Sequence, residues 1–403
     1  MNLSARKPDF TFLSSLGWKC FILLMLFTGA MPMSASIQAV LPDGDITEDN
    51  TIDIADYLHG LQYLLGNRTL STDAINMGDV APLLNGVPDP NGTLDTADVM
   101  VLLRMILYGI NFSYPANQFN IGDSIGEGQA ANGGGMFHEH VWSTGYLEND
   151  SVNSFNERFE QADSLAYEEN NVERDTIYNL AQSGAVMADF VDQAQNVVAN
   201  ASALPSGEAG MVTVLLGNND VCAPSNSEMT DPSLFEDQFR AGLDVLAGDE
   251  ATRLAQIHIS GIPAIYWLWV AKRNNWICRV FIWPFVPCQN LLDEPQNDCV
   301  SSDSRNDPDN DYPNENVDCQ RRKNFHRLIR EDYNTLLQDV AKEYRDNGLL
   351  PNIRYFDIFD VQFGTEHVND DDCFHPSVAG HKLLAEEAWC RTHWRTSDGQ
   401  CPN

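Results

Sequence analysis

Three short segments hold the residue types of nucleophilic catalysis, and they occur far apart but in a fixed order. Residues 122–126 read Gly-Asp-Ser-Ile-Gly, residues 217–220 read Gly-Asn-Asn-Asp, and residues 372–375 read Asp-Cys-Phe-His. They supply a hydroxyl, an amide donor, and a base with a carboxylate three residues before it. A serine hydroxyl becomes nucleophilic when an adjacent base takes its proton. Each segment alone has little specificity, but the combination predicts acyl transfer from an ester to water.

Each residue of the predicted site has its own role. Ser124 follows an apolar run, so we expect a strand-to-helix turn to hold its hydroxyl exposed. His375 is the predicted base, and Asp372 is expected to fix its tautomer and stabilise the imidazolium. The side-chain amide of Asn219 and the backbone N–H groups of Ser124 and Gly184 are expected to form an oxyanion hole.

The same residues also have structural interpretations. Ser124 fits a turn, Asp123 fits a cap on that turn, and Asn219 with Asp220 fits an Asx turn. His381 lies in a helical pattern and is expected to be structural. For the catalytic set as a whole, a structural interpretation requires several coincidences in chain order, so we favour the catalytic one.

The elements that must position these residues follow an α/β pattern. Four apolar runs are predicted as strands: 119–121, 212–216, 264–270 and 354–358. Helical patterns lie between them, and the clearest covers 321–344. Short apolar strands alternating with helices indicate a parallel sheet that is covered on both faces. Functional groups are then expected at the carboxyl ends of the strands.

Residues 119–390 resemble the SGNH, or GDSL-type, hydrolases. The resemblance rests on four blocks in chain order, which match Ser124, Gly184, Asn219 and His375, with Asp372 as the third triad member. It implies a three-layer α/β/α sandwich with a parallel sheet, and an esterase, lipase, phospholipase or carbohydrate deacetylase that needs no cofactor for catalysis. The segments 217–222 and 372–389 are most similar to the phospholipase B-like branch. Ile125 replaces the leucine of the family motif.

Residues 40–111 contain a degenerate repeat in which an acidic loop precedes an apolar helix pattern. Alternating oxygen side chains that end in a carboxylate on the exiting helix are typical of EF-hand calcium loops. The expected Ca²⁺ ligands are Asp45, Thr47, Asp49 and Asp56 in the first copy, and Asp89, Asn91 and Asp98 in the second. Position one of the second loop falls on Val87, so Asp79, before an apparent insertion, is an alternative ligand.

The two copies together resemble a type I dockerin module. The resemblance implies a small all-α calcium-loop module and a cohesin-like partner protein. An acidic turn before an amphipathic helix explains one copy equally well, but two copies with the same ending weaken that interpretation. Because calcium supplies folding energy to small modules, we expect its removal to unfold residues 40–110 while activity persists.

Two substrate classes follow from these resemblances. The phospholipase-like segments favour a lipid or phospholipid ester, whereas the dockerin-like module favours an acylated polysaccharide of the acetylxylan type. The aromatic runs 266–270 and 281–285 fit the lining of an acyl pocket, although buried strands have the same pattern and are more common. An inactive hydrolase fold that only binds through its N-terminal module is disfavoured by the complete motif set.

The N-terminus predicts export. Basic residues precede an apolar run at 21–27 that is too short to span a bilayer, and small residues follow it. We therefore expect a secreted, extracellular or periplasmic protein. Its predicted parts are a signal peptide at 1–39, the calcium module at 40–111, a linker at 112–118 and the hydrolase domain at 119–403.

Charge and cysteine content agree with this organisation. The chain has 24 Lys and Arg against 58 Asp and Glu, and its formal net charge of −34 excludes nucleic acid as a partner. Of nine cysteines, eight lie beyond the predicted signal peptide, and an even set in an exported chain indicates disulfides. The simplest pairing joins 278 to 288, 299 to 319 and 390 to 401, leaving 222 for 373. Connectivity does not follow from sequence alone.

The segment 302–318 is rich in Asp, Asn and Pro. One interpretation is a solvated loop closed by a disulfide. Another is a calcium loop that uses alternate carboxylates, but Tyr312 at position six argues against it.

Overall fold

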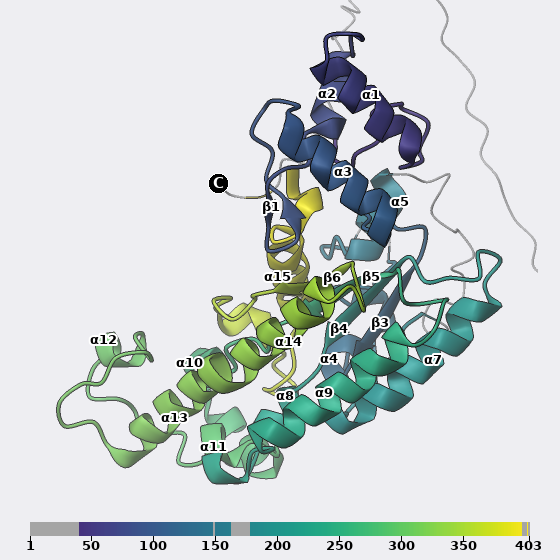
Figure 1. The fold of residues 1–403 in the computed structure, drawn as a ribbon. Coiled ribbons are helices and arrows are strands. Elements are labelled where there is room, and N and C mark those ends of the chain that lie inside the picture. Colours follow the sequence, from purple (N-terminus) through teal and green to yellow (C-terminus); the bar gives the residue numbers. More distant parts are fainter. Residues whose placement is uncertain (1–39, 148–149, 163–177, 397–400, 402–403) are drawn as a thin grey trace, which may run out of the picture. The chain divides into compact units, whose positions relative to one another are not determined.

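The computed structural model describes residues 40–147, 150–162, 178–396 and 401 (Figure 1). The predicted signal peptide at 1–39 lies outside the described residues. The described residues from 40 onward belong to one compact unit. Within the described part of the chain, no helix has the length and apolar character needed to cross a membrane.

A four-stranded parallel sheet forms the centre of the larger region. Its strands are β3 (Gln118–Gly122), β4 (Met211–Leu215), β5 (Gln256–Ser260) and β6 (Ile353–Phe356). They lie in the order β3-β4-β5-β6, and every neighbouring pair is parallel. All but one of the strand residues are buried, because both faces of the sheet are covered. The α/β fold with a parallel sheet, predicted from sequence, is therefore confirmed.

Helices pack on both faces of this sheet (Figure 1). One core joins alternate strand residues to α7 (Phe190–Ala203), α9 (Pro232–Ala247) and α14 (Thr335–Asp346). The other core joins the opposite strand residues to α5 (Phe155–Ala162) and α15 (Val378–Trp389). This division follows from the strand period of two, which sends successive side chains to opposite faces.

The third predicted strand is wrong. Residues Tyr266–Lys272 form helix α10, and the strand is Gln256–Ser260 instead. Its pattern is interrupted by His258, which is buried and stacks on Trp394 with ring centroids 5.2 Å apart. A buried polar residue between two isoleucines hid the strand, while a continuous apolar run has no period that separates helix from strand.

The long predicted helix at 321–344 is confirmed as one helical run with a local change of hydrogen bonding. It comprises α13 (Val317–Leu328), the π-helical turn η7 (Ile329–Asn334) and α14. At the end of the π turn, the Asn334 side chain accepts from the backbone N–H of Ile262 and donates to its carbonyl. The turn thereby ties this helix to the loop after β5.

Three helices and a hairpin make up the N-terminal region. The helices are α1 (Ile54–Leu64), α2 (Thr72–Gly78) and α3 (Thr96–Tyr108), and the hairpin strands are β1 (Leu83–Leu84) and β2 (Val87–Pro88). Asp53 and Asp95 cap α1 and α3 in the same way, each with an aspartate at the third helical position. The hairpin means that this region is not purely helical. It has its own apolar core around Leu102 and Met105.

The N-terminal region contacts the start of β6 through polar groups. The buried Arg354 donates to the carbonyls of Gly86 and Asn111, and the Asn352 amide donates to the carbonyl of Gly109. These bonds satisfy a buried guanidinium that would otherwise be costly. The two regions are therefore joined by more than the chain between them.

Four disulfides join the eight cysteines, a number typical of proteins in oxidising, extracellular compartments. They pair Cys222 with Cys288, Cys278 with Cys373, Cys299 with Cys319, and Cys390 with Cys401. The predicted pairs 299–319 and 390–401 are confirmed, whereas 278–288 and 222–373 are wrong. The two ends of the segment 278–288 lie against different parts of the chain. Its cysteines therefore bond to Cys373 and Cys222 rather than to each other.

Candidate active site

Ser124 lies at the sharp turn between β3 and α4 (Ser124–Glu127). Asp123 caps this short helix by accepting from the backbone N–H of Ile125 at 3.0 Å, as its structural interpretation predicts. The turn is close-packed, because a Cβ on Gly126 would lie 2.7 Å from the Cβ of Ala181. The glycine is therefore required for the turn to form as it does.

The structure brings Ser124, His375 and Asp372 into one hydrogen-bonded line. The Nε2 atom of His375 is 2.9 Å from the Ser124 Oγ, and its Nδ1 atom is 2.6 Å from the Asp372 Oδ2. The other oxygen of Asp372 accepts from the backbone N–H groups of Phe374 and His375. A carboxylate held in this way can orient the imidazole, and an imidazole at 2.9 Å can accept the serine proton.

Asn369 holds the turn that carries Asp372, and sequence reasoning missed it. Its side-chain oxygen accepts from the backbone N–H groups of Asp371 and Asp372, and its amide donates to the carbonyl of Ala130 at 2.6 Å. In the same turn, the side chain of Asp370 pairs with Lys272 of α10. The only sequence signal for Asn369 is an amide three residues before Asp372, which is too common to be recognised without the fold.

Asn219 and Gly184, the two other residues predicted to form an oxyanion hole, lie close to each other. Asn219 is on α8 (Asn218–Val221), and its amide donates to the carbonyl of Ala185 at 2.9 Å. Ala185 directly follows Gly184, which is exposed, has a φ of +82° and has open space where a Cβ would be. Asn219 lines the same pocket as Ser124. An amide with a second N–H to donate therefore lies in the pocket of the serine.

Two buried carboxylates support the turn at Ser124 and the helix of Asn219. The Asn218 amide donates to Asp123 at 2.8 Å, and burial raises the pKa of Asp123. Burial also raises the pKa of Asp220 to about 6, although the N–H of Met187 and the Thr230 hydroxyl donate to it. These bonds tie α8 to the segments on either side.

An apolar pocket of about 60 Å³ opens beside the serine. Its polar groups come from the residues described above, and its remaining wall is largely apolar: Ile125, Pro263, Ile265, Leu268, Phe363, Val368, Phe374 and Pro376. A pocket with an apolar wall and a few convergent polar groups is the usual form of a ligand site. This one has room for an apolar group attached to the atom that the serine would attack.

Comparison with known proteins agrees with this geometry. The family model of the GDSL-like lipases and acylhydrolases matches residues 119–388. The chain belongs to this family. The match spans the sheet, the Ser124 turn and the loop of His375, and it supports a hydrolase that acts on esters. No curated protein matches the chain.

A second histidine near the GDSL-type site does not take part in the hydrogen-bonded line. His381, on α15, is fully buried, and burial lowers its pKa to about 3. It is therefore neutral at ordinary pH, in keeping with its structural interpretation. His140 pairs with Asp150 at 2.6 Å.

The first candidate calcium loop, N-terminal to the GDSL-type domain, folds around two buried carboxylates. Asp45 accepts from the backbone N–H groups of Asp49 and Asn50 and from the Thr47 hydroxyl. Asp56 accepts from the N–H groups of Thr47 and Asp53. Asn50 has a φ of +63°, which allows the tight turn at position six. Oxygen ligands from carboxylates on both sides of one loop fit the preference of Ca²⁺.

The second loop is built like the first, but Asp79 takes the place of Asp45. Asp79 accepts from the backbone N–H groups of Asn91 and Gly92, and Asp98 accepts from those of Ala81 and Asp95. The residues between Ala81 and Asn91 form the β1–β2 hairpin as an insertion within the loop.

Asp89, an expected ligand of this second loop, lies at the exposed end of that hairpin. Its backbone N–H bonds to the carbonyl of Pro82. Burial raises the pKa of Asp98, and the charges of Asp79 and Asp95 raise it further. A divalent cation would relieve this repulsion, so Asp79, Asn91 and Asp98 fit a calcium site.

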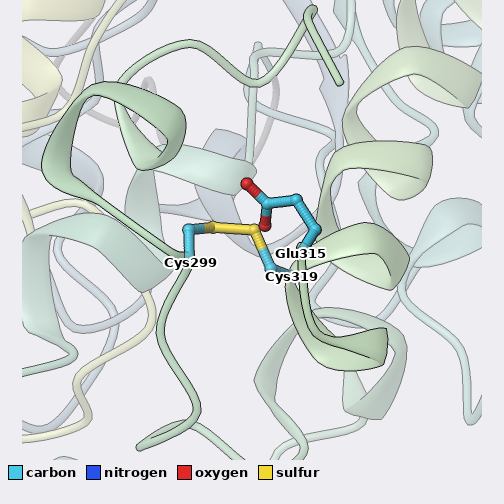
Figure 2. A group of neighbouring side chains, drawn as sticks. All are labelled: Cys299, Glu315 and Cys319. Carbon is cyan, nitrogen blue, oxygen red and sulfur yellow. A yellow bond between two sulfur atoms is a disulfide. The ribbon is translucent and has the colours of Figure 1, made fainter. Parts of the chain in front are cut away.

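One further group of metal-ligand residue types gathers in the described part of the chain. Figure 2 shows Cys299, Glu315 and Cys319, whose two sulfur atoms are joined to each other. The Glu315 carboxylate lies 3.5 Å from the Lys323 ammonium and accepts from the Ser304 hydroxyl. With the thiols oxidised and the carboxylate engaged, this group lacks the thiolates that a metal would bind.

The acidic segment at 302–318 also lacks the geometry of a calcium loop. Asp309 pairs with Arg330, Asp311 pairs with Arg327, and Asp318 pairs with Arg321. These three carboxylates are thus engaged by cations, and Asp307 instead accepts from Asn310 and Tyr312. The disulfide that closes the loop fits the simpler interpretation.

Proposed function

We propose that this protein is an exported serine esterase that hydrolyses carboxylic esters through an acyl-enzyme. The single observation that carries the proposal is the line from Ser124 Oγ through His375 to Asp372, with its distances of 2.9 and 2.6 Å. His375 takes the Ser124 proton as the oxygen attacks the ester carbonyl. It then returns the proton to the leaving alcohol, and a water molecule releases the acid by the same steps in reverse.

The developing oxyanion is stabilised by three donors. These are the backbone N–H groups of Ser124 and Gly184 and the side-chain amide of Asn219. The bond of Asn219 to the carbonyl of Ala185 holds one N–H in place and leaves the other for substrate. Preorganised donors of this kind contribute because they need no reorientation during the reaction.

A lipid ester is the preferred substrate class. The apolar wall of the pocket favours an acyl chain, because such groups gain free energy on leaving water. An acetylated polysaccharide is the alternative, since an acetyl group also fits a small apolar space and the N-terminal region resembles modules found on polysaccharide-active enzymes.

The N-terminal region is proposed to bind calcium and a partner protein. Its ligands would be Asp45, Thr47, Asp49 and Asp56 in one loop and Asp89, Asn91 and Asp98, with Asp79, in the other. The repeated capping and hydrogen bonding of the two loops supports a dockerin-like module with a cohesin-like partner. Export would proceed through the predicted signal peptide at 1–39.

The first test is hydrolysis of a soluble short-chain p-nitrophenyl ester by the full chain. Ser124→Ala is expected to lower kcat by about 10³-fold or more, since the nucleophile is lost. Ser206→Ala changes an exposed serine away from the site and serves as the matched control. A wild-type chain without turnover would support the inactive binding protein instead, and an active Ser124→Ala variant would refute the nucleophile.

The second test separates the two substrate classes. Phosphatidylcholine and acetylated xylan are offered in parallel, and released fatty acid and acetate are measured. Faster release of fatty acid is expected. Acetate release from xylan alone would assign the protein to the carbohydrate esterases.

A further inference from the structure

Residues 276–285 carry large apolar side chains that face solvent. Five of them are between 47% and 84% exposed: Trp276, Ile277, Val280, Phe281 and Phe285. We call residues 276–285 the apolar segment. Trp276 and Phe281 lie edge to face with ring centroids 5.5 Å apart, so exposed rings gather on one surface rather than scatter. A cluster of this kind on a folded domain indicates an interaction site.

The apolar segment is fastened beside the active-site pocket at both ends. The Cys278–Cys373 disulfide joins its first turn to the residue just before Phe374 and His375. The Cys222–Cys288 disulfide joins the chain just beyond it to Cys222, which lines the pocket. In between, the buried Trp283 donates its indole N–H to the carbonyl of Cys373 at 2.9 Å.

Neighbouring elements extend this attachment to the pocket. Helix α10, which precedes the apolar segment, contributes Leu268 to the pocket wall. Helix α11 (Gln289–Leu292), which follows it, lies against the end of α8 (Figure 1), where Asn290 and Ala223 exchange hydrogen bonds. The exposed side chains are therefore carried by the same framework that builds the pocket.

The charge around the apolar segment differs from that of the whole chain. Residues 251–292 contain no Asp or Glu, although the chain has 58 of them. Two cations nearby, Lys272 and Arg273, are paired with Asp370 and Asp298. A chain segment without carboxylates can approach an apolar phase at a lower desolvation cost than an acidic one. The net charge of −34 disfavours an anionic membrane and also a second copy of this chain.

We propose that the apolar segment docks on a zwitterionic phospholipid surface, such as a phosphatidylcholine bilayer, and holds the pocket against it. The inference rests on the proposed esterase function and identifies esters within a lipid aggregate as its substrate class. Exposed Trp and Phe side chains suit the boundary between headgroups and acyl chains, where their apolar area leaves water. The disulfides keep the docking surface and the pocket in a fixed relation.

The test is flotation of the full-length chain with phosphatidylcholine vesicles, alongside hydrolysis of a soluble short-chain ester. The triple variant Trp276→Ser, Phe281→Ser, Phe285→Ser is expected to lower the vesicle partition coefficient at least about tenfold. Its kcat/KM on the soluble ester is expected to stay within about twofold of wild type, because no changed residue lines the pocket.

The matched triple control is Leu234→Ser, Val317→Ser, Leu349→Ser. These side chains are also exposed but belong to α9, to α13 and to the turn after α14. The control is expected to bind vesicles as wild type does. The single variant Phe285→Ser, at the most exposed of the five positions, is expected to weaken binding without affecting the fold, which circular dichroism checks.

The outcomes separate the docking surface from the proposed function. Wild type that turns over the soluble ester but fails to float with vesicles would overturn the docking proposal alone. A triple variant that floats normally with vesicles would also overturn the docking proposal. So would a triple variant whose only change is the conversion of a dimer to a monomer, measured by light scattering. Vesicle binding without hydrolysis of the soluble ester or of phosphatidylcholine would uphold the docking surface and reject the esterase.

Discussion

Asp372 combines two kinds of contact at the scale of single residues. One carboxylate oxygen faces the His375 ring, and the other accepts from two backbone N–H groups of its own loop. The backbone of the loop therefore orients the carboxylate, and the carboxylate in turn orients the imidazole ring. Such preorganisation costs nothing during the reaction, which is why short Asp-x-x-His segments suit a triad.

Asp372→Asn is expected to reduce kcat by about 10²–10⁴-fold on a soluble ester, because the amide favours the wrong imidazole tautomer. The comparison is Asp371→Asn, one residue earlier, which is expected to stay near wild type. Equal losses in both variants would point to damage of the loop rather than of the imidazole.

Asp220 gives a pH-dependent prediction. Its pKa is raised from 3.8 to about 6 by burial, so the native state holds its proton more tightly than the unfolded state does. Its ionised form therefore destabilises the fold above pH 6, and this cost is relieved as pH falls through 6 toward 4. Relative to Asp220→Asn, wild type should gain about 2 kcal/mol in unfolding free energy between pH 8 and pH 4. Denaturant titrations of both proteins measure it, and a constant difference would contradict the raised pKa.

At the scale of elements, the loop of His375 depends on distant segments. Cys373 is bonded to Cys278, and Asp370 is paired with the buried Lys272 of α10. The loop has a left-handed residue at Cys373, with a φ of +54°. A cross-link that closes many residues restricts the unfolded chain most.

The double variant Cys278→Ser, Cys373→Ser is expected to lose about 2–5 kcal/mol of stability and much of its activity. The control Cys390→Ser, Cys401→Ser removes a disulfide that closes only a short loop away from the pocket, and should keep full activity. Thermal melts and soluble-ester kinetics are compared. Unchanged kinetics in the first variant would mean that packing alone positions His375.

At the scale of the whole molecule, the N-terminal region and the GDSL-type domain share polar contacts. Arg354 of β6 is buried beneath carbonyls of residues 86 and 111. Unfolding of residues 40–110 would expose this guanidinium to water. Water would then solvate its charge, so the charge would not remain buried without partners. The larger domain is thus expected to survive loss of the smaller one, although with lower thermal stability.

Chelation of calcium is therefore expected to lower helical circular dichroism and the first melting temperature, while ester hydrolysis at 25 °C persists. The double variant Asp45→Ala, Asp56→Ala removes the carboxylates of the first loop and should lose most of the calcium response. Activity lost in parallel with helicity would contradict separate folding. A chain indifferent to chelator would contradict the calcium loops.

The sequence by itself determined the order and identity of the proposed catalytic groups, since acyl transfer needs particular side chains in short local contexts. It also predicted three of the four strands and the repeat of the acidic loops, because local periodicity sets these elements. The features that the sequence failed to predict depend on contacts between residues that are far apart along the chain. The strand around His258 needed its buried neighbours to be recognised, and Asp79 joins its loop only across a hairpin.

Only the tertiary structure decided the pairing of cysteines 222, 278, 288 and 373. It also decided that Phe281 and Phe285 stand exposed beside the pocket rather than inside a sheet. Many long-range pairings satisfy the same local pattern, and only packing selects among them. The sequence thus determined the chemistry of the site, and the packing of distant segments determined what surrounds it.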